Sequence, residues 1–145
     1  MNHVNLIREL AQAGKHCHCA GGRRCTGFIL MKRTIGIRPS EAVIDKDLAS
    51  ALLGSVIGAD EFYILTDVPY VYINYKKPDQ EIKEFLDYKD TMKYLSEGQF
   101  TKGSMAPKIE ACLNFIRAGG SKSVITEAFK LEDRRYGTKI TMEYD

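Results

Sequence analysis

Residues 41–75 read EAVIDKDLASALLGSVIGADEFYILTDVPYVYINY, and this stretch decides the fold class. Leu48, Leu52 and Val56 recur at every fourth position, so they share one face of a helix. We therefore expect a helix over residues 47–57. The chain then changes to two runs rich in β-branched and aromatic residues, EFYILTD and VYINY, which predict strands. A helix that leads directly into strands indicates a mixed α/β domain.

The rest of the chain continues this alternation. We expect a helix over residues 88–98 and a firmer one around Ile109, Cys112, Leu113 and Ile116, whose spacing fits one helical face. The runs KSVITEA and GTKITMEYD predict two further strands. Helices that alternate with apolar strands indicate a layered α/β domain with a largely parallel sheet.

The ends of the first helix are marked by capping residues. The carboxylate of Asp45 or of Asp47 would accept hydrogen bonds from the first backbone N–H groups. Gly58 suits the C-terminal end, because glycine adopts the left-handed conformation there without steric cost.

The composition bounds the class of protein. The chain has 145 residues, of which 44% are hydrophobic and 28% are charged, as in an ordinary globular domain. No apolar run approaches the roughly 18–20 residues that span a membrane, and the mixed charge of the first residues does not fit a signal peptide. The four cysteines suggest no disulfide framework, so we expect a cytoplasmic protein.

Residues 15–37 differ in composition from the remainder. No acidic residue lies between Glu9 and Glu41, while six lysines and arginines and three of the four cysteines do. When FILMKRTIGI is back-translated and read from its third nucleotide, it gives YFDEKDNWY, an acidic and aromatic stretch that leads naturally into RPSEAVIDKD. We therefore hypothesise that residues 15–37 are read out of frame.

Two functional interpretations of this segment are weaker. His16, Cys17, His18, Cys19 and Cys25 offer metal-ligand atoms, but adjacent ligands cannot all reach one tetrahedral ion and the usual spacing is missing. The basic run lacks the interleaved aromatic residues of a nucleic-acid module, so a solvated charged stretch is favoured. We expect no metal site and no nucleic-acid partner.

The run GSMAPKIEA, residues 103–111, places Lys108 in the first turn of the expected helix around Ile109 to Ile116. A helix N-terminus carries a partial positive charge and disfavours a cation. The same lysine cooperates with the helix when both face a phosphate. With Lys46 across the site, two cations would face a transferring phosphoryl group, and Asp47 would orient them.

Three polar segments follow apolar ones in places where α/β proteins bind ligands. Ligands bind beyond the carboxyl ends of the strands, and VIDKDLAS, ILTDVPY and TKGSMAPK all fall there. Each alone has a plain explanation as an N-cap, a turn or a loop before a helix, and GSM is no Walker motif. In this order and on these elements they predict a nucleotide phosphate site.

The segments EAVIDKDLASALL, ILTDVPYVYINY and GQFTKGSMAPKIEAC resemble carbamate kinase, a family of the amino-acid kinase superfamily. The resemblance runs from about Arg38 to Thr138 and covers only the C-terminal, nucleotide-binding half of that family. It implies an α/β three-layer sandwich with a largely parallel sheet. Residues 1–37 would be a partial or disrupted N-terminal segment, and residues 38–145 the nucleotide-binding half.

The resemblance also implies an activity: reversible phosphoryl transfer between carbamoyl phosphate and ADP, giving ATP and carbamate, with Mg²⁺, in a homodimer of arginine metabolism. Lys46 and Lys108 would contact the transferred group, and Asp47 would orient them. The implied nucleotide-binding residues are Thr66, Asp67, Val68, Tyr72, Gly103, Ser104, Met105 and Pro107. Gly21 and Gly22, which match part of a glycine-rich loop of the family, would contact the substrate.

Two alternatives stay open. The family's N-terminal half is absent from this sequence, which favours a catalytically inactive truncated remnant that retains only nucleotide or subunit binding. An amino-acid kinase with a different acid substrate is the other alternative, since substrate choice lies mainly in that absent half. The run PYVYINY argues against the second.

Overall fold

The structure, a computed structural model, describes residues 45–143. In this part the elements follow one another as α2 (Lys46–Ile57), β1 (Glu61–Thr66), β2 (Val71–Ile73), β3 (Glu81–Lys83), β4 (Phe85–Asp87), α3 (Tyr88–Ser96), α4 (Met105–Arg117), β5 (Lys122–Glu127), the short 3₁₀ helix η1 (Ala128–Lys130) and β6 (Thr138–Thr141). The main sheet has the strand order β1-β5-β6-β4, and β2 pairs with β3 in a separate hairpin.

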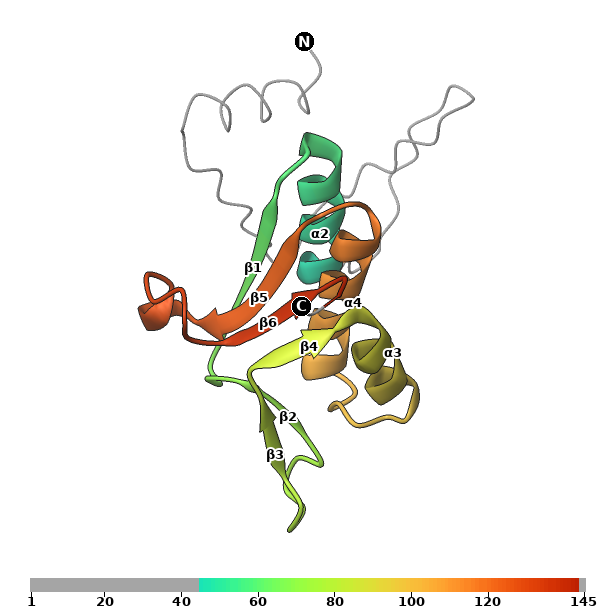
Figure 1. The fold of residues 1–145 in the computed structure, drawn as a ribbon, viewed down its shortest axis with the longest axis vertical. Helices are drawn as coiled ribbons and strands as arrows, with labels where there is room; N and C mark the ends of the chain where they lie inside the picture. Colours follow the sequence, from blue (N-terminus) through green and yellow to red (C-terminus); the bar gives the residue numbers. More distant parts are fainter. Residues whose placement is uncertain (1–44, 144–145) are drawn as a thin grey trace.

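The main sheet is mixed, with two parallel pairs and one antiparallel pair. β1 runs parallel to β5, and β4 runs parallel to β6, whereas β5 and β6 are antiparallel. The helices α2, α3 and α4 cover one face of this sheet, and the β2–β3 hairpin projects from one end of it (Figure 1). The expected α/β class with a mostly parallel sheet is confirmed.

Helix α4 occupies the centre of the core. It packs against α2, α3 and three strands of the main sheet, and its buried residues are Ile109, Ala111, Cys112, Leu113, Phe115 and Ile116. The ring of Phe115 lies 5.3 Å from that of Phe62 on β1. A Cβ atom at Gly120 would lie 2.0 Å from the Phe115 ring, so this glycine also makes room for the core.

Helix α2 begins and ends with the expected caps. The Asp45 carboxylate accepts hydrogen bonds from the backbone N–H groups of Asp47 at 2.8 Å and Leu48 at 3.2 Å. Gly58 closes the helix in the left-handed conformation, with a φ of 72°. Asp45 is therefore the N-cap, which leaves the side chain of Asp47 available for another contact.

The structure departs from the sequence prediction around the hairpin. The run VYINY forms a strand only over β2, and this strand leaves the main sheet to pair with β3. Strands β3 and β4 were not predicted. Each is three residues long and contains a charged residue, so neither shows a period of its own. They form because β2 and β6 offer backbone partners.

The remaining predictions within residues 45–143 are confirmed: the helix expected over residues 88–98 is α3, and the last two strands are β5 and β6. None of the helices in the part of the chain that the structure describes has the length and hydropathy for crossing a bilayer. The expected organisation of residues 1–37 lies outside the described residues.

One buried hydroxyl joins the hairpin to the main sheet. The Oγ1 atom of Thr138 accepts a hydrogen bond from the backbone N–H of Val71 at 2.7 Å and donates one to the carbonyl of Lys83 at 2.5 Å. The side chain of Thr138 is fully buried, so no water can replace it. This residue therefore holds β2 and β3 against the first residue of β6.

We predict that Thr138→Val lowers the free energy of unfolding by about 2–4 kcal/mol. Valine has nearly the same shape but leaves a buried N–H and a buried carbonyl without their partner. Thr138→Ser is the control: it keeps the hydroxyl and loses only a methyl group, at about 1 kcal/mol. Urea denaturation of the three proteins measures both effects, and equal losses for valine and serine would contradict the assigned role of the hydroxyl.

A second prediction concerns the reactivity of Cys112. Complete burial raises the pKa of this thiol to about 12, so at pH 8 almost none of it is the reactive thiolate. We expect iodoacetamide to leave the peptide that contains Cys112 unmodified in the native protein and to modify it fully in denaturant. Peptide mass spectrometry after timed labelling measures this, and rapid native labelling would show that α4 opens.

Candidate functional site

The carboxyl end of β1, the hairpin and the start of α4 surround a cavity of about 260 Å³. The residues that line it are Thr66, Asp67, Val68, Tyr72, Tyr75, Thr101, Ser104, Met105 and Lys108. The site is thus built from two segments that lie apart in the sequence, residues 66–75 and 101–108. It lies where α/β domains usually bind ligands, at the carboxyl end of a strand and the start of a helix.

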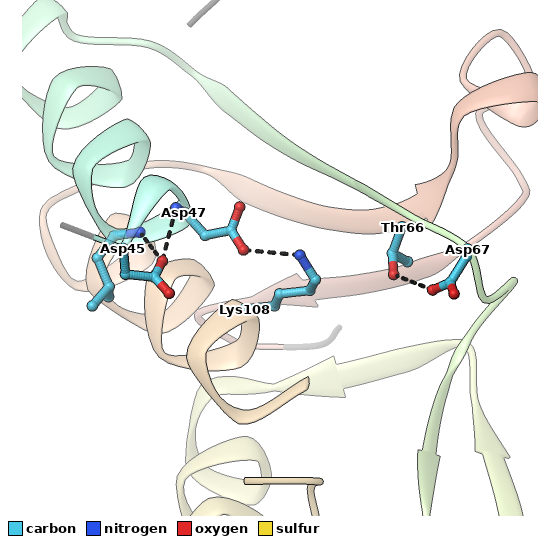
Figure 2. A network of polar contacts seen from close by, with 6 residues as sticks. Asp45, Asp47, Thr66, Asp67 and Lys108 are labelled. Atoms are coloured by element: carbon cyan, nitrogen blue, oxygen red, sulfur yellow. Dashed lines mark hydrogen bonds and ion pairs between the residues drawn. The ribbon is translucent and has the colours of Figure 1, made fainter. Parts of the chain in front are cut away.

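Lys108, the fourth residue of α4, is paired with Asp47 in the first turn of α2. Its Nζ atom lies 2.8 Å from Oδ2 of Asp47, and the two side chains are only 16% and 17% exposed. Figure 2 shows this contact, with Thr66 and Asp67 at the end of β1 nearby. The carboxylate that pairs with Lys108, a cation at a helix N-terminus, therefore comes from the start of another helix.

The electrostatics of this pair are favourable on balance. A cation in the first turn of a helix costs about 0.3–1 kcal/mol. A hydrogen bond between charged groups contributes about 1.5–3 kcal/mol, and Asp47 itself lies at the helix end that favours an anion. The ion pair therefore more than offsets the position of Lys108, and it fixes the ammonium at the wall of the cavity.

The backbone at the start of α4 differs from expectation. The N–H groups of Ser104, Met105 and Ala106 all donate to the carbonyl of Thr101, at 3.3, 3.1 and 3.1 Å, and Pro107 has no N–H group. These donors, at the helix end that was expected to face a phosphate, share this carbonyl as their partner. The charge for an anion at this helix end comes instead from the side chain of Lys108.

The predicted nucleotide residues fall into two groups. Those that line the cavity are Thr66, Asp67, Val68, Tyr72, Ser104 and Met105. Gly103 and Pro107 lie in the same loop and helix start but are not part of the lining. Gly103 has a φ of 131°, a conformation that side chains rarely adopt, which explains the glycine. Their roles in binding stay predictions.

The other predicted site residues are Lys46, Gly21 and Gly22. Lys46 is the exposed first residue of α2 and is not part of the cavity lining. Gly21 and Gly22 fall outside residues 45–143. Tyr75 and Thr101 line the cavity without having been predicted. Both belong to runs that the sequence analysis singled out, VYINY and GQFTKGSM. Their closeness in the sequence to predicted binding residues was the signal that could have identified them.

The cavity has an aromatic side and a polar side. The rings of Tyr72 and Tyr75 lie 5.7 Å apart at 48°, and Met105 adds a flexible apolar side chain. The polar side carries Lys108 and the pair Thr66 and Asp67, in which the threonine hydroxyl donates to the carboxylate at 3.2 Å. A planar ring and an anionic group in one ligand would suit these two sides.

Residues that could hold a metal ion are few. Within residues 45–143 no three His, Cys, Asp or Glu side chains are grouped as metal ligands. Asp67 is the carboxylate that lines the cavity. Magnesium in kinases is commonly held by one or two carboxylates together with phosphate oxygens and water, so this donor fits a Mg²⁺ ion that is bound together with a nucleotide.

Comparison with known proteins identifies the family. Residues 4–127 match the family described as "Amino acid kinase family". The carbamate kinase of Thermoplasma volcanium is 43% identical over 120 residues, which cover 83% of this chain and 38% of that protein. Carbamate kinase 2 of Staphylococcus aureus (strain bovine RF122 / ET3-1) is 43% identical over 143 residues, covering 94% and 44%. The chain therefore spans less than half the length of these curated relatives.

Solved structures agree with the sequence comparison. The carbamate kinase from Giardia lamblia bound to AMP-PNP is 39% identical, with a TM-score of 0.70 over 74% of this chain and 39% of that one. Another structure of Giardia carbamate kinase reaches a TM-score of 0.78 at 33% identity, covering 96% and 48%. The chain therefore belongs to the amino acid kinase family, and within that family the relatives it resembles are carbamate kinases.

Proposed function

We propose that this chain supplies the nucleotide-binding part of a carbamate kinase-like phosphotransferase. The reaction would transfer a phosphoryl group reversibly between carbamoyl phosphate and ADP, giving ATP and carbamate. The observation that carries the proposal is the ammonium of Lys108, which lines the cavity while Asp47 holds it at 2.8 Å. The similarity to carbamate kinases over most of this chain supports the choice of substrates.

The cavity suits the nucleotide. Its volume of about 260 Å³ lies just below the range of complete ligand pockets, roughly 300–1,000 Å³. It would therefore hold the base and sugar, with the phosphates extending toward Lys108. Tyr72 and Tyr75 would contact the base. The relative from Giardia lamblia bound to AMP-PNP supports a nucleotide as the ligand.

Lys108 would stabilise the charge of the transferred group. Phosphoryl transfer depends mainly on positioning and on electrostatic stabilisation, with little covalent work by the protein. A lysine ammonium has three N–H donors, and Asp47 accepts from one of them. The other donors can face phosphoryl oxygens while the carboxylate prevents the long side chain from moving away.

Lys46 would supply a second cation. It adjoins Asp47 at the start of α2 and is exposed, so its side chain can turn toward the phosphates of a bound nucleotide. Mg²⁺, held by phosphate oxygens with Asp67 as the protein ligand, would neutralise further negative charge. Both roles follow from the need to offset the charge of a nucleotide and a carbamoyl phosphate at one place.

The test is ATP formation from carbamoyl phosphate, ADP and Mg²⁺, measured in a coupled assay, with ADP binding measured by calorimetry. We predict that Lys108→Met lowers kcat by about 10²–10³-fold, as the loss of one charge-stabilising donor does. Asp47→Asn should lower kcat by about 10-fold, because the lysine loses its anionic partner. Removal of Mg²⁺ with a chelator should abolish ATP formation.

Lys102→Met is the matched control. Lys102 is an exposed lysine six positions before Lys108, in the loop that leads into α4, and it does not line the cavity. Its replacement should leave kcat and the Kd for ADP unchanged. Equal losses in the two methionine variants would show that net charge, not position, matters. ADP binding without ATP formation in the unaltered chain would refute phosphoryl transfer by this chain alone and leave nucleotide binding.

A further inference from the structure

We infer that Gln99 is a positioning residue for the nucleotide. Its side chain bonds to Asn74, the residue that follows β2. This bond holds the hairpin where Tyr72 and Tyr75 form the aromatic side of the cavity. The inference rests on the proposed function of that cavity. Gln99 itself is not part of the lining, so its effect on a ligand would pass through the hairpin.

The backbone of Gln99 is firmly held. It follows α3, where Gly98 adopts a φ of 69° and donates its N–H to the carbonyl of Leu95 at 3.1 Å. The N–H of Gln99 donates to the carbonyl of Tyr94 at 3.0 Å. The next residue, Phe100, is only 3% exposed and belongs to the core. Gln99 therefore projects its side chain from a rigid support.

The side chain of Gln99 reaches the hairpin. Its Oε1 atom accepts a hydrogen bond from the backbone N–H of Asn74 at 3.3 Å, in a partly buried position. Ile73, the residue before Asn74, is 7% exposed and belongs to the same core as Phe100. Buried neighbours on both sides restrict water from competing for this bond.

Asn74 lies between the two tyrosines in an uncommon conformation. Its φ is 51°, and that of Lys76 is 63°, whereas most residues other than glycine avoid positive φ. Two further bonds stabilise the turn from within the hairpin: Asn74 Nδ2 donates to Asp79 at 2.7 Å, and the N–H of Lys76 donates to Gln80 at 2.9 Å.

The hydrogen bonds at this turn connect it to different parts of the molecule. The bonds to Asp79 and Gln80 shape the turn but stay within it. Of the bonds that the described residues make at this turn, the one to Gln99 connects the hairpin to the segment that leads into α4. Thr138 holds the other end of the hairpin against the main sheet. The hairpin is thus attached at its base and, through Gln99, beside the tyrosines.

Loss of this bond should displace Tyr75, which directly follows Asn74. Tyr72 should stay in place because it lies between the buried Val71 and Ile73, and Lys108 because its support comes from α4 and Asp47. Contacts to the base of a nucleotide should then weaken, and contacts to its phosphates should not. Gln99 would therefore contribute to affinity for the nucleoside part of the ligand.

The experiment measures the affinities of the 145-residue chain for ADP and for inorganic pyrophosphate by calorimetry. Gln99→Met keeps the length of the side chain but has no strong acceptor, so the Kd for ADP should rise about 3–10-fold, as expected for one hydrogen bond. The Kd for pyrophosphate should stay the same. Gln99→Glu keeps an acceptor oxygen for the Asn74 N–H and should bind ADP like the unaltered protein.

Gln80→Met is the matched control, because it removes a similar side-chain acceptor from the same turn without freeing the hairpin. It should leave the Kd for pyrophosphate unchanged and raise the Kd for ADP less than Gln99→Met does. The inference would be overturned if Gln99→Met bound ADP normally, or if it lost affinity for ADP and pyrophosphate equally. It would also be overturned if Gln99→Glu bound ADP as weakly as Gln99→Met.

Amide hydrogen exchange separates this inference from the proposed function. Gln99→Met should speed exchange at Asn74 in the absence of any ligand, and Gln80→Met should not. If the unaltered chain binds no ADP, the proposed function fails and the inference fails with it. If the unaltered chain binds ADP and Gln99→Met exchanges faster at Asn74 yet binds ADP equally well, only the inference fails.

Discussion

The ion pair between Lys108 and Asp47 is the contact on which the site depends. It joins the first turns of α2 and α4, two helices that pack against each other on one face of the sheet. Without Asp47, the lysine would be a cation at the positive end of a helix, partly buried and without a counter-charge. With Asp47 as its partner, the lysine instead provides a fixed positive charge at the wall of a cavity.

The remainder of the site is held by contacts of a different kind. The polar side of the cavity belongs to the rigid layer of helices and sheet, because Thr66 ends a strand and Lys108 begins a helix. The aromatic side belongs to a hairpin outside the main sheet. That hairpin is attached through the buried side chains of Val71 and Ile73, the buried hydroxyl of Thr138 and the side chain of Gln99. Core packing and two hydrogen-bonded links therefore set the distance between the part that would meet a base and the part that would meet phosphates.

Much of this arrangement could be predicted from the chain alone. The four-residue recurrence of Leu48, Leu52 and Val56 identified α2, and the charge of Lys108 at a helix start identified a place that needs an anion. Strands β3 and β4 could not be predicted, because three-residue strands with charged residues have no period and exist only through their partners. Tyr75 and Thr101 were not predicted as lining residues for a similar reason: only the hairpin and the loop together bring them to the cavity.

By itself, the sequence determined the alternation of helices and strands, the C-terminal cap of α2 and the place of the polar segments after apolar ones, and it narrowed the N-cap of α2 to Asp45 or Asp47. These features depend on neighbours within a few residues, where periodicity and capping chemistry act directly. Only the tertiary structure decided that Lys108 and not Lys46 lines the cavity, that Thr101 accepts from the N–H groups at the start of α4, and that the hairpin forms one side of the cavity. Some of these contacts join residues that are distant in the chain, and others compete for the same backbone donors. The packing of the domain decides which of the possible contacts form.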